Sequence, residues 1–598
     1  MKRSEIDKKY KWDLTAVFES DEAFESEFGT LEREIAAYPA HSDKMLGSAE
    51  ELYLALDTMM SLMARLDRVW IFASLSYYVD TLDPVAQERS SRARDLAQKF
   101  DEATWFVSPY LMKLDDKTLE SYLNDCPELM RFSRYIYKTR RYKSHTLSDE
   151  GEELVSRLGD CFGHYDEIRS ALTISDLRFG KIRDAEGKSV QLSDTNYIAY
   201  MMSGDRRVRR SAFKTLYKTY GQFKSTFASL YYNYVKESMT LSRLRGYSST
   251  IERSTFADEV TPEICNNLID TVGKSLPKLF EYYELKREVL GLDKMHMYDI
   301  YTPLLTEGDE RTYTFEEAVG EVLRAAEIFG EEYHSIMKEG LTERGWVDVY
   351  PSVGKRGGAF SAGCSGTEPY ILTNFNGTAE DISTLAHEAG HSMHSYYSRK
   401  FNEPHASRYT LFVAEVASTV NELLLLRMRL REARTRLEKL ELLNRLMELY
   451  KSTLFRQTML AEFERDIHAL CESGKPLTAD LISKTYYEKV LRYFGDGVVC
   501  EPEIALEWAR IPHFYMNFYV YKYATSISAA SMIVKRIEDE GEPYIRQYIE
   551  FLKCGDSHSP IDELLVAGVD MTRPEVIDVA IDAFSEAVSE FKRIYYNG

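Results

Sequence analysis

Apolar residues recur every three or four positions along most of the chain, and charged residues fill the positions between them. The pattern is clearest over residues 49–66, 85–106 and 435–471. This spacing is typical of helices that bury one face. Only 31 glycines and 16 prolines occur in 598 residues, which agrees with long, uninterrupted helices. We therefore expect a mainly α-helical fold.

Two regions have a pattern that favours strands. Residues 177–182 and 189–192 flank a turn-forming stretch with Gly187, which predicts a β-hairpin within residues 175–193. Residues 346–350 and 370–375 predict two further strands, on either side of a glycine-rich stretch. We expect these two to form a small sheet inside the helical protein.

Composition narrows the class of protein. The formal net charge is -21, so phosphate backbones should repel the chain and a nucleic-acid partner is not expected. The first residues are charged where a signal peptide needs an apolar core, and no apolar run is long enough to span a membrane. Seven scattered cysteines without a CxxC pair fit a reducing compartment. We expect a cytoplasmic protein that does not bind membranes.

Residues 383–397, which read STLAHEAGHSMHSYY, contain a candidate metal site. His387 and His391 are four apart, so a helix places them one turn apart on the same face. Two imidazoles at this spacing can bind one zinc ion, and Glu388 lies where a general base acts on water. Gly390 costs about 1 kcal/mol relative to alanine within a helix, which indicates the close approach of another element.

A catalytic zinc site needs a third protein ligand. His394 follows His391 by three residues, but it lies roughly 10 Å along the helix axis from His387. A straight helix cannot bring all three imidazoles within about 2 Å of one ion. We therefore expect His394 to support a ligand or to pack. His405 follows Pro404, but the HExxHxxGxxH pattern is absent.

Glu415 is the preferred third ligand. It lies in an otherwise apolar helical stretch, residues 408–422, where a carboxylate needs a partner. Glu422 lies two turns further on, nearly in register, and is expected either to orient a ligand histidine through its second ring nitrogen or to form a structural ion pair.

Hydrolysis also needs groups that stabilise negative charge on the carbonyl oxygen. Residues 510–525 contain one histidine and four tyrosines: His513, Tyr515, Tyr519, Tyr521 and Tyr523. If the segment is one helix, His513 and Tyr521 share one side and the other three share the opposite side. Only one side can face a cleft, and we favour His513 and Tyr521.

The glycine-rich stretch at residues 354–366 and the strand after it are candidates for substrate binding. An exposed strand edge can pair with an extended peptide, and glycines allow a close approach. The candidate residues are Gly357, Gly358, Ala359, Phe360 and Tyr370.

With these residues the sequence resembles the oligopeptidase F branch of the thimet-oligopeptidase-like (M3) zinc peptidases. The likeness extends from about residue 200 to the C-terminus, and Trp12-Asp13-Leu14 resembles the start of the family. The matching stretches are GWVDVY at 345–350, GKRGGAFS at 354–361, HEAGH at 387–391 with His394, FVAEVAS at 412–418, PHFY at 512–515 and YKYA at 521–524.

The resemblance implies a helical fold with a deep channel between two helical halves, which admits short peptides and excludes folded proteins. It implies an N-terminal helical region at residues 1–200, a catalytic region at residues 201–598, and one zinc ion held by His387, His391 and Glu415, with Glu388 as base. Family members also use a late histidine and tyrosines near the scissile carbonyl. The thimet branch spaces two such tyrosines seven apart, but Phe514 stands seven before Tyr521 here, which leaves that role to His513 or Tyr515. Some descriptions of the family take a later histidine as third ligand, which would be His394.

The resulting expectation is a zinc endopeptidase for short oligopeptides. A carboxypeptidase or dipeptidyl carboxypeptidase is an alternative, and it would need a fixed cation for the substrate carboxylate, such as Lys355 or Arg356. A helical peptide-binding protein without turnover is the alternative outside enzymes. The sequence leaves the oligomeric state open.

Overall fold

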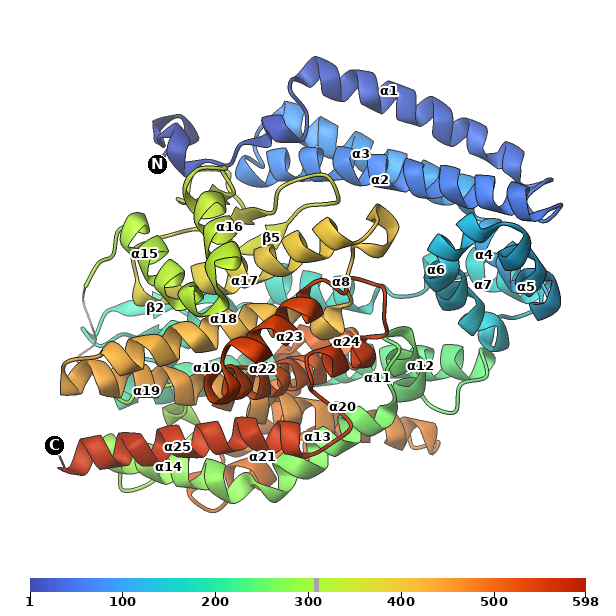
Figure 1. Ribbon diagram of the computed structural model, residues 1–598. Helices are drawn as coiled ribbons and strands as arrows, with labels where there is room; N and C mark the ends of the chain where they lie inside the picture. Colours follow the sequence, from blue (N-terminus) through green and yellow to red (C-terminus); the bar gives the residue numbers. More distant parts are fainter. Residues whose placement is uncertain (306–310, 598) are drawn as a thin grey trace. The chain divides into compact units, whose positions relative to one another are not determined.

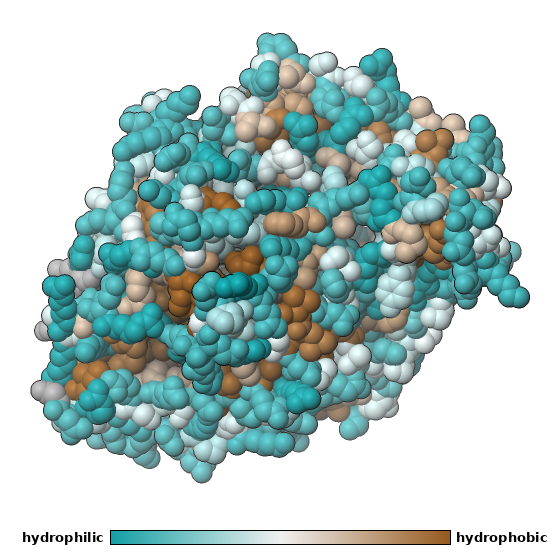
Figure 2. All heavy atoms as spheres, in the orientation of Figure 1, coloured by the Kyte–Doolittle hydropathy of each residue, from teal (hydrophilic) through white to brown (hydrophobic). Residues whose placement is uncertain are grey.

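The computed structural model describes residues 1–305 and 311–597, and most of them are helical (Figure 1). The predicted mainly α-helical class with small sheets is therefore confirmed. No described helix is long and apolar enough to cross a membrane. Hydrophilic side chains cover most of the face shown in Figure 2.

The chain folds into two compact units that each combine three separate stretches. The first consists of Met1–Ser144, Glu310–Met428 and Ile533–Val569. The second consists of His145–Asp309, Arg429–Met532 and Asp570–Gly598. The boundary expected near residue 200 falls inside the second unit, because helices distant in the sequence share each core.

The first unit contains the predicted metal site. Its long N-terminal helices α1, α2 and α3 pack side by side around Phe24, Phe28 and Phe72 (Figure 1). Its α-helices are α1 Asp21–Ala37, α2 Ala49–Val79, α3 Pro84–Thr104, α4 Val107–Lys113, α5 Asp116–Asp125, α6 Ser133–Arg140, α15 Phe315–Ala326, α16 Glu331–Thr342, α17 Ala379–Phe401, the first part of α18 Leu411–Glu432, the last part of α22 Tyr521–Glu540, α23 Glu542–Leu552 and α24 Pro560–Val566.

The second unit contains the predicted hairpin and the aromatic segment. Strands β1 Lys181–Arg183 and β2 Ser189–Gln191 pair antiparallel, so the hairpin is confirmed. Strands β3 Met295–His296 and β7 Val498–Val499 form a parallel pair that the sequence pattern missed. Its remaining α-helices are α7 Asp149–Arg157, α8 Tyr165–Ser170, α9 Asp194–Met201, α10 Arg206–Gln222, α11 Lys224–Leu244, α12 Thr250–Ala257, α13 Pro262–Lys274, α14 Leu276–Val289, α19 Arg436–Tyr450, α20 Arg456–Glu472, α21 Ala479–Phe494 and α25 Glu575–Asn597.

A three-stranded sheet lies next to α17 in the first unit. Its strands are β4 Val347–Asp348, β5 Phe360–Ala362 and β6 Tyr370–Leu372, in the order β4-β6-β5. The two predicted strands, β4 and β6, are confirmed and run parallel, and β5 adds antiparallel to β6. The expectation that the Tyr370 strand offers an edge to substrate is wrong, because β6 is the middle strand. The edge strand near α17 is β5.

The segment 510–525 is not one helix. A short 3-10 helix covers Pro512–Tyr515, and α22 begins only at Tyr521. Between them Asn517 and Phe518 have φ of 28° and 54°, which interrupts the helical path. The division of this segment into two helical faces is therefore wrong.

Candidate metal centre and active site

Helix α17 begins at a capping box just before the candidate ligands. The Asp381 backbone N–H donates to Thr378 Oγ1 at 3.2 Å, and the Thr378 N–H donates to Asp381 Oδ2 at 2.8 Å. Downstream, the His387 and His391 rings lie with their centroids 5.0 Å apart. The cap fixes the start of the helix, and the four-residue spacing then places both imidazoles on one face.

Gly390 allows α18 to lie against α17. A Cβ at Gly390 would come within 2.7 Å of both the Ala417 carbonyl oxygen and Ser418 Cα. The close approach that the glycine indicated is therefore confirmed. It brings the first turns of α18, with Glu415, next to the two histidines.

The structure brings together His387, His391 and Glu415. Glu415 Oε2 lies 3.2 Å from His387 Nε2 and 3.5 Å from His391 Nε2. One ligand atom from each residue lies within 4.8 Å of the others. Tetrahedral zinc with ligands at roughly 2.0–2.1 Å separates its ligand atoms by about 3.4 Å. The two nitrogens and the oxygen therefore fit a zinc ion that keeps a fourth position open.

The charges around His387 favour a cation. Glu422 Oε2 lies 3.4 Å from His387 Nδ1, on the side of the ring away from Glu415. Burial lowers the pKa of His387, but hydrogen bonds to Glu415 and Glu422 outweigh burial and raise it to about 10. Burial also raises the pKa of Glu415, but the two histidines outweigh it and hold the pKa well below its usual value. Glu415 is therefore an ionised carboxylate, as a metal ligand must be.

Glu388 lies on α17 with 7% of its surface exposed. Burial raises the pKa of its carboxyl group, and the nearby His391 and His387 oppose that rise. The backbone N–H of Ser361 in β5 hydrogen-bonds to the carboxylate. Its Oε2 has no hydrogen-bond partner among residues 1–305 and 311–597. This carboxylate has a raised pKa and an open oxygen, and both suit a general base.

The hydrogen bonds of the sheet show which way the edge of β5 faces. Ile371 N–H donates to Trp346 O at 2.7 Å, and Thr373 N–H donates to Asp348 O at 2.9 Å, so both point toward β4. The N–H and C=O groups of successive residues point to alternate sides of a strand. The β6 residues on either side of Ile371 therefore direct these groups toward β5. Ser361 pairs opposite Ile371, so its own N–H and C=O face the free edge. This agrees with the bond from Ser361 to Glu388.

His394 lies in an aromatic core. It is fully buried, its ring stacks on Tyr409 with centroids 3.7 Å apart, and Phe551 lies 5.2 Å away. Neither ring nitrogen has a hydrogen-bond partner in the described part of the chain. Burial lowers the pKa of His394 to about 3. These contacts are those of a packing residue, one of the two roles expected for it.

The predicted transition-state groups belong to the second unit, whereas the metal ligands belong to the first. The His513 ring lies 5.9 Å from that of Tyr519 and 6.1 Å from that of Tyr523. The Tyr515 ring instead lies beside that of Tyr234, at 5.2 Å. Tyr521 is fully buried, and burial raises its pKa well above the usual value.

The turn between these aromatic residues is held by hydrogen bonds from groups distant in the sequence. Phe518 N–H donates to Glu464 Oε1 at 2.7 Å, and Asn517 N–H donates to the Tyr234 hydroxyl at 3.0 Å. Ser254 Oγ donates to the Asn517 carbonyl at 2.8 Å. Glu464 is fully buried, and burial raises its pKa to about 8, although the Phe518 N–H opposes the rise.

Two of these positions were not predicted from the sequence. Glu464 has charged neighbours in the sequence, Glu462 and Arg465, so it does not stand out as Glu415 does in its apolar stretch, and only the structure shows that it is buried. Ser361 acts through its backbone N–H, and the type of residue at a position does not indicate such a role.

Comparison with known proteins identifies the family. The sequence model of peptidase family M3 matches residues 199–582, and a model described as oligopeptidase F matches residues 111–179. Oligopeptidase PepF of Bacillus subtilis is 40% identical, over 99% of this chain and 88% of its own length. The plasmid-encoded oligoendopeptidase F of Lactococcus lactis subsp. cremoris is 33% identical, over 100% of this chain and 99% of its own.

Solved structures give the same result. A putative peptidase from Chlamydophila abortus has a TM-score of 0.93 at 33% identity, covering 99% of both chains. Oligoendopeptidase-F from Enterococcus faecium has a TM-score of 0.75 at 31% identity, covering 97% of this chain and 100% of its own.

The chain therefore belongs to peptidase family M3. Within that family it is a metalloendopeptidase of the oligopeptidase F branch.

Proposed function

We propose that this enzyme hydrolyses short oligopeptides at internal bonds, with one zinc ion held by His387, His391 and Glu415. The convergence of these three side chains beside Glu388 carries the proposal. Bound there, zinc supplies the Lewis acidity that activates water and polarises the scissile carbonyl. Glu422 orients the His387 ring from its other nitrogen.

Glu388 is the proposed base and acid. Its open oxygen takes the proton of the attacking water and then delivers it to the leaving amine. The Ser361 N–H holds the other side of the carboxylate, so the group stays aimed while it gains and loses a proton.

The free edge of β5 is the proposed site of substrate pairing. At Ser361 the N–H is taken by Glu388, and the carbonyl is left to accept a hydrogen bond from substrate. An extended peptide bound to that carbonyl would lie alongside Glu388. Gly357, Gly358, Ala359 and Phe360 lead into the strand and would contact the substrate. Tyr370 contributes from the middle strand as support, with its hydroxyl donating to Asp13 O at 3.1 Å.

Among the late aromatic residues, His513 is the preferred group for stabilising the charge on the carbonyl oxygen. It is partly exposed, and burial lowers its pKa. Tyr515 is partly exposed too and is the second candidate for this role. Tyr521 is a weaker candidate, because its side chain is buried. The channel between two helical halves that the resemblance implies stays a prediction.

The carboxypeptidase alternative loses one of its two candidate cations. Lys355 Nζ lies 2.8 Å from Asp348 Oδ1, and both side chains are buried, so this ammonium is already paired. Arg356 remains open, but the free edge of β5 does not by itself restrict cleavage to a terminus.

The deciding experiment is a digest of one decapeptide with and without a zinc chelator, followed by mass spectrometry. We expect chelator-sensitive fragments from internal cuts, restored by added zinc. Exclusive release of one or two C-terminal residues would favour the carboxypeptidase alternatives. Intact peptide under all conditions would favour a binding protein without turnover.

A further inference from the structure

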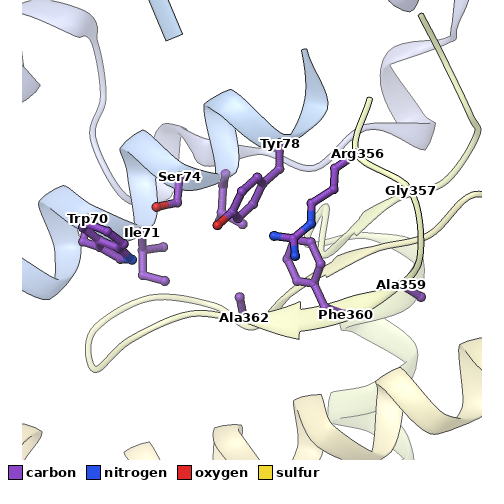
Figure 3. Close-up of a pocket in the computed structure, with 10 residues that line it drawn as sticks. Trp70, Ile71, Ser74, Tyr78, Arg356, Gly357, Ala359, Phe360 and Ala362 are labelled. Carbon is purple, nitrogen blue, oxygen red and sulfur yellow. The ribbon is translucent and has the colours of Figure 1, made fainter. Parts of the chain in front are cut away.

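A cavity of about 310 Å³ lies between α2 and β5 in the first unit (Figure 3). Trp70, Ser74 and Tyr78 line it from the helix, and Phe360 and Ala362 line it from the strand. Most of this lining is apolar or aromatic. The cavity is large enough for one bulky side chain, at the small end of ligand pockets.

Arg356 brings a positive charge to this cavity. Its guanidinium carbon lies 4.6 Å from the centre of the Tyr78 ring and 5.7 Å from that of Phe360. In the described part of the chain no carboxylate lies within 4.0 Å of it, whereas the adjacent Lys355 is paired with Asp348. The guanidinium of Arg356 is exposed, lies over two aromatic rings and has no carboxylate partner there, so it is available to bind an anion.

The backbone of Arg356 is fixed in place. Its N–H donates to the Tyr78 carbonyl at 2.8 Å, and its carbonyl accepts from Asn374 Nδ2 at 3.0 Å. The backbone that carries the guanidinium is therefore already ordered, so binding an anion would restrict only the side chain.

The cavity lies on a defined face of the edge strand. Ser361 points toward α17, because its Oγ lies 2.9 Å from Ser392 Oγ. Side chains alternate along a strand, so Phe360 and Ala362 point to the opposite face, where the cavity lies. A peptide paired with β5 would place every second side chain on that same face.

The direction of the peptide decides which of its ends meets Arg356. Arg356 precedes Phe360, the first residue of β5, by four positions. An antiparallel peptide brings its C-terminus toward the start of β5, and thus its carboxylate toward the guanidinium. A parallel peptide would bring its ammonium group there, which Arg356 would repel.

We propose that Arg356 and this cavity form a subsite for the C-terminal residue of a short peptide substrate. The guanidinium binds the terminal carboxylate, and the cavity takes an apolar or aromatic side chain. The subsite would hold peptides whose C-terminus reaches it from the cleavage site, and so would set the position of the cut relative to that end. This inference rests on the proposed pairing of substrate with β5.

The test compares two peptides of identical sequence that end in phenylalanine, one with a free carboxylate and one with a C-terminal amide. The enzymes are wild type, Arg356→Gln, Arg356→Lys and Arg94→Gln. Arg94 is an exposed arginine of α3 that forms no ion pair with any residue among 1–305 and 311–597, so its substitution changes the net charge equally. Wild type should cleave the acid about tenfold more efficiently in kcat/KM, mainly through KM. Arg356→Gln should bring that ratio close to one, whereas Arg356→Lys should retain part of it and Arg94→Gln all of it.

Equal cleavage of both peptides by wild type would overturn the proposal. So would an equal loss of the preference in Arg356→Gln and Arg94→Gln, which would show an effect of net charge. If neither peptide is cut, the proposed function fails separately. Fluorescence anisotropy of the same labelled peptides on the same variants then decides the subsite: the acid should bind wild type more tightly than the amide, and equal affinities would refute it.

Discussion

Gly390 of α17 and Ser418 of α18 meet backbone to backbone, with no space between them for a methyl group. A Cβ on Gly390 would lie 2.7 Å from Ser418 Cα. Glu415 lies one turn before Ser418, and the Ser418 Oγ donates to its carboxylate at 3.2 Å. The contact between the two backbones therefore sets the distance at which Glu415 reaches the histidines.

Gly390→Ala should weaken zinc binding as well as stability. The added methyl group must push α18 away, which we expect to cost about 1–3 kcal/mol of unfolding free energy. The matched control is Gly320→Ala in α15, where nothing lies within 4 Å of the added Cβ. That variant should be neutral or more stable by up to about 1 kcal/mol. Zinc titration and thermal unfolding measure both effects, and normal zinc affinity in Gly390→Ala would contradict the role of the contact.

Glu388→Gln should retain zinc and lose turnover. The amide keeps the shape of the side chain but cannot take a proton, so kcat should fall by about 100- to 10,000-fold. Metal content and peptide hydrolysis are measured on the same preparation. Glu380→Gln, an exposed substitution in the first turn of α17, serves as control and should stay active. Substantial turnover by Glu388→Gln would show that another group is the base.

Glu415→Ala and His394→Phe should separate a metal ligand from a packing residue. Removal of the Glu415 carboxylate should reduce zinc affinity by more than the 10- to 100-fold typical of losing a supporting group. The His394→Phe variant should bind zinc as tightly as wild type, because neither imidazole nitrogen of His394 has a partner in the described structure. Its unfolding free energy should change by less than about 1.5 kcal/mol. The opposite pattern of zinc loss would make His394 the ligand.

Glu464 should make stability fall as pH rises above its unfolded pKa. Burial raises its pKa from 4.5 to about 8, so the folded protein holds this proton more tightly than the unfolded chain. The stabilisation is complete below pH 4.5 and is lost as pH rises toward 8. The slope from this one proton is at most about 1.4 kcal/mol per pH unit.

Glu464→Gln is the matching variant, because its amide oxygen can still accept the Phe518 N–H. We expect the melting temperature of this variant to exceed that of wild type by a margin that grows between pH 5 and pH 8. A margin that is constant over this range would show that Glu464 does not titrate there.

Much of the fold and the core of the site were predictable because they follow from local rules. Periodic apolar positions located α2, α3, α19 and α20, and the spacing of His387 and His391 fixed their shared face. Gly390 revealed the neighbouring helix through its conformational cost. Glu415 lies in an apolar stretch where a carboxylate needs a partner, and this predicted it as the third ligand. The helix that carries Glu415 is the one that packs against Gly390.

The rest depends on contacts between distant parts of the chain. β5 is short and is flanked by small residues, so its sequence pattern resembles that of a loop. Only its pairing with β6 makes it a strand. The turn at Asn517 and Phe518 is stabilised by Tyr234 and Glu464, which the local sequence does not contain. A helical pattern therefore continued, in the sequence, across a break that tertiary hydrogen bonds impose.

The assembly of each unit from three stretches has a consequence for biosynthesis. Helix α17, which carries both histidines, packs through His394 against Phe551, a residue made much later by the ribosome. A domain of continuous sequence can fold as it emerges from the ribosome, whereas the first unit cannot complete its core until its last stretch has been synthesised. Its many long-range contacts should slow folding as well. We expect a nascent chain stopped before residue 533 to expose the apolar surface around His394, and to depend on chaperones until its last helices are released.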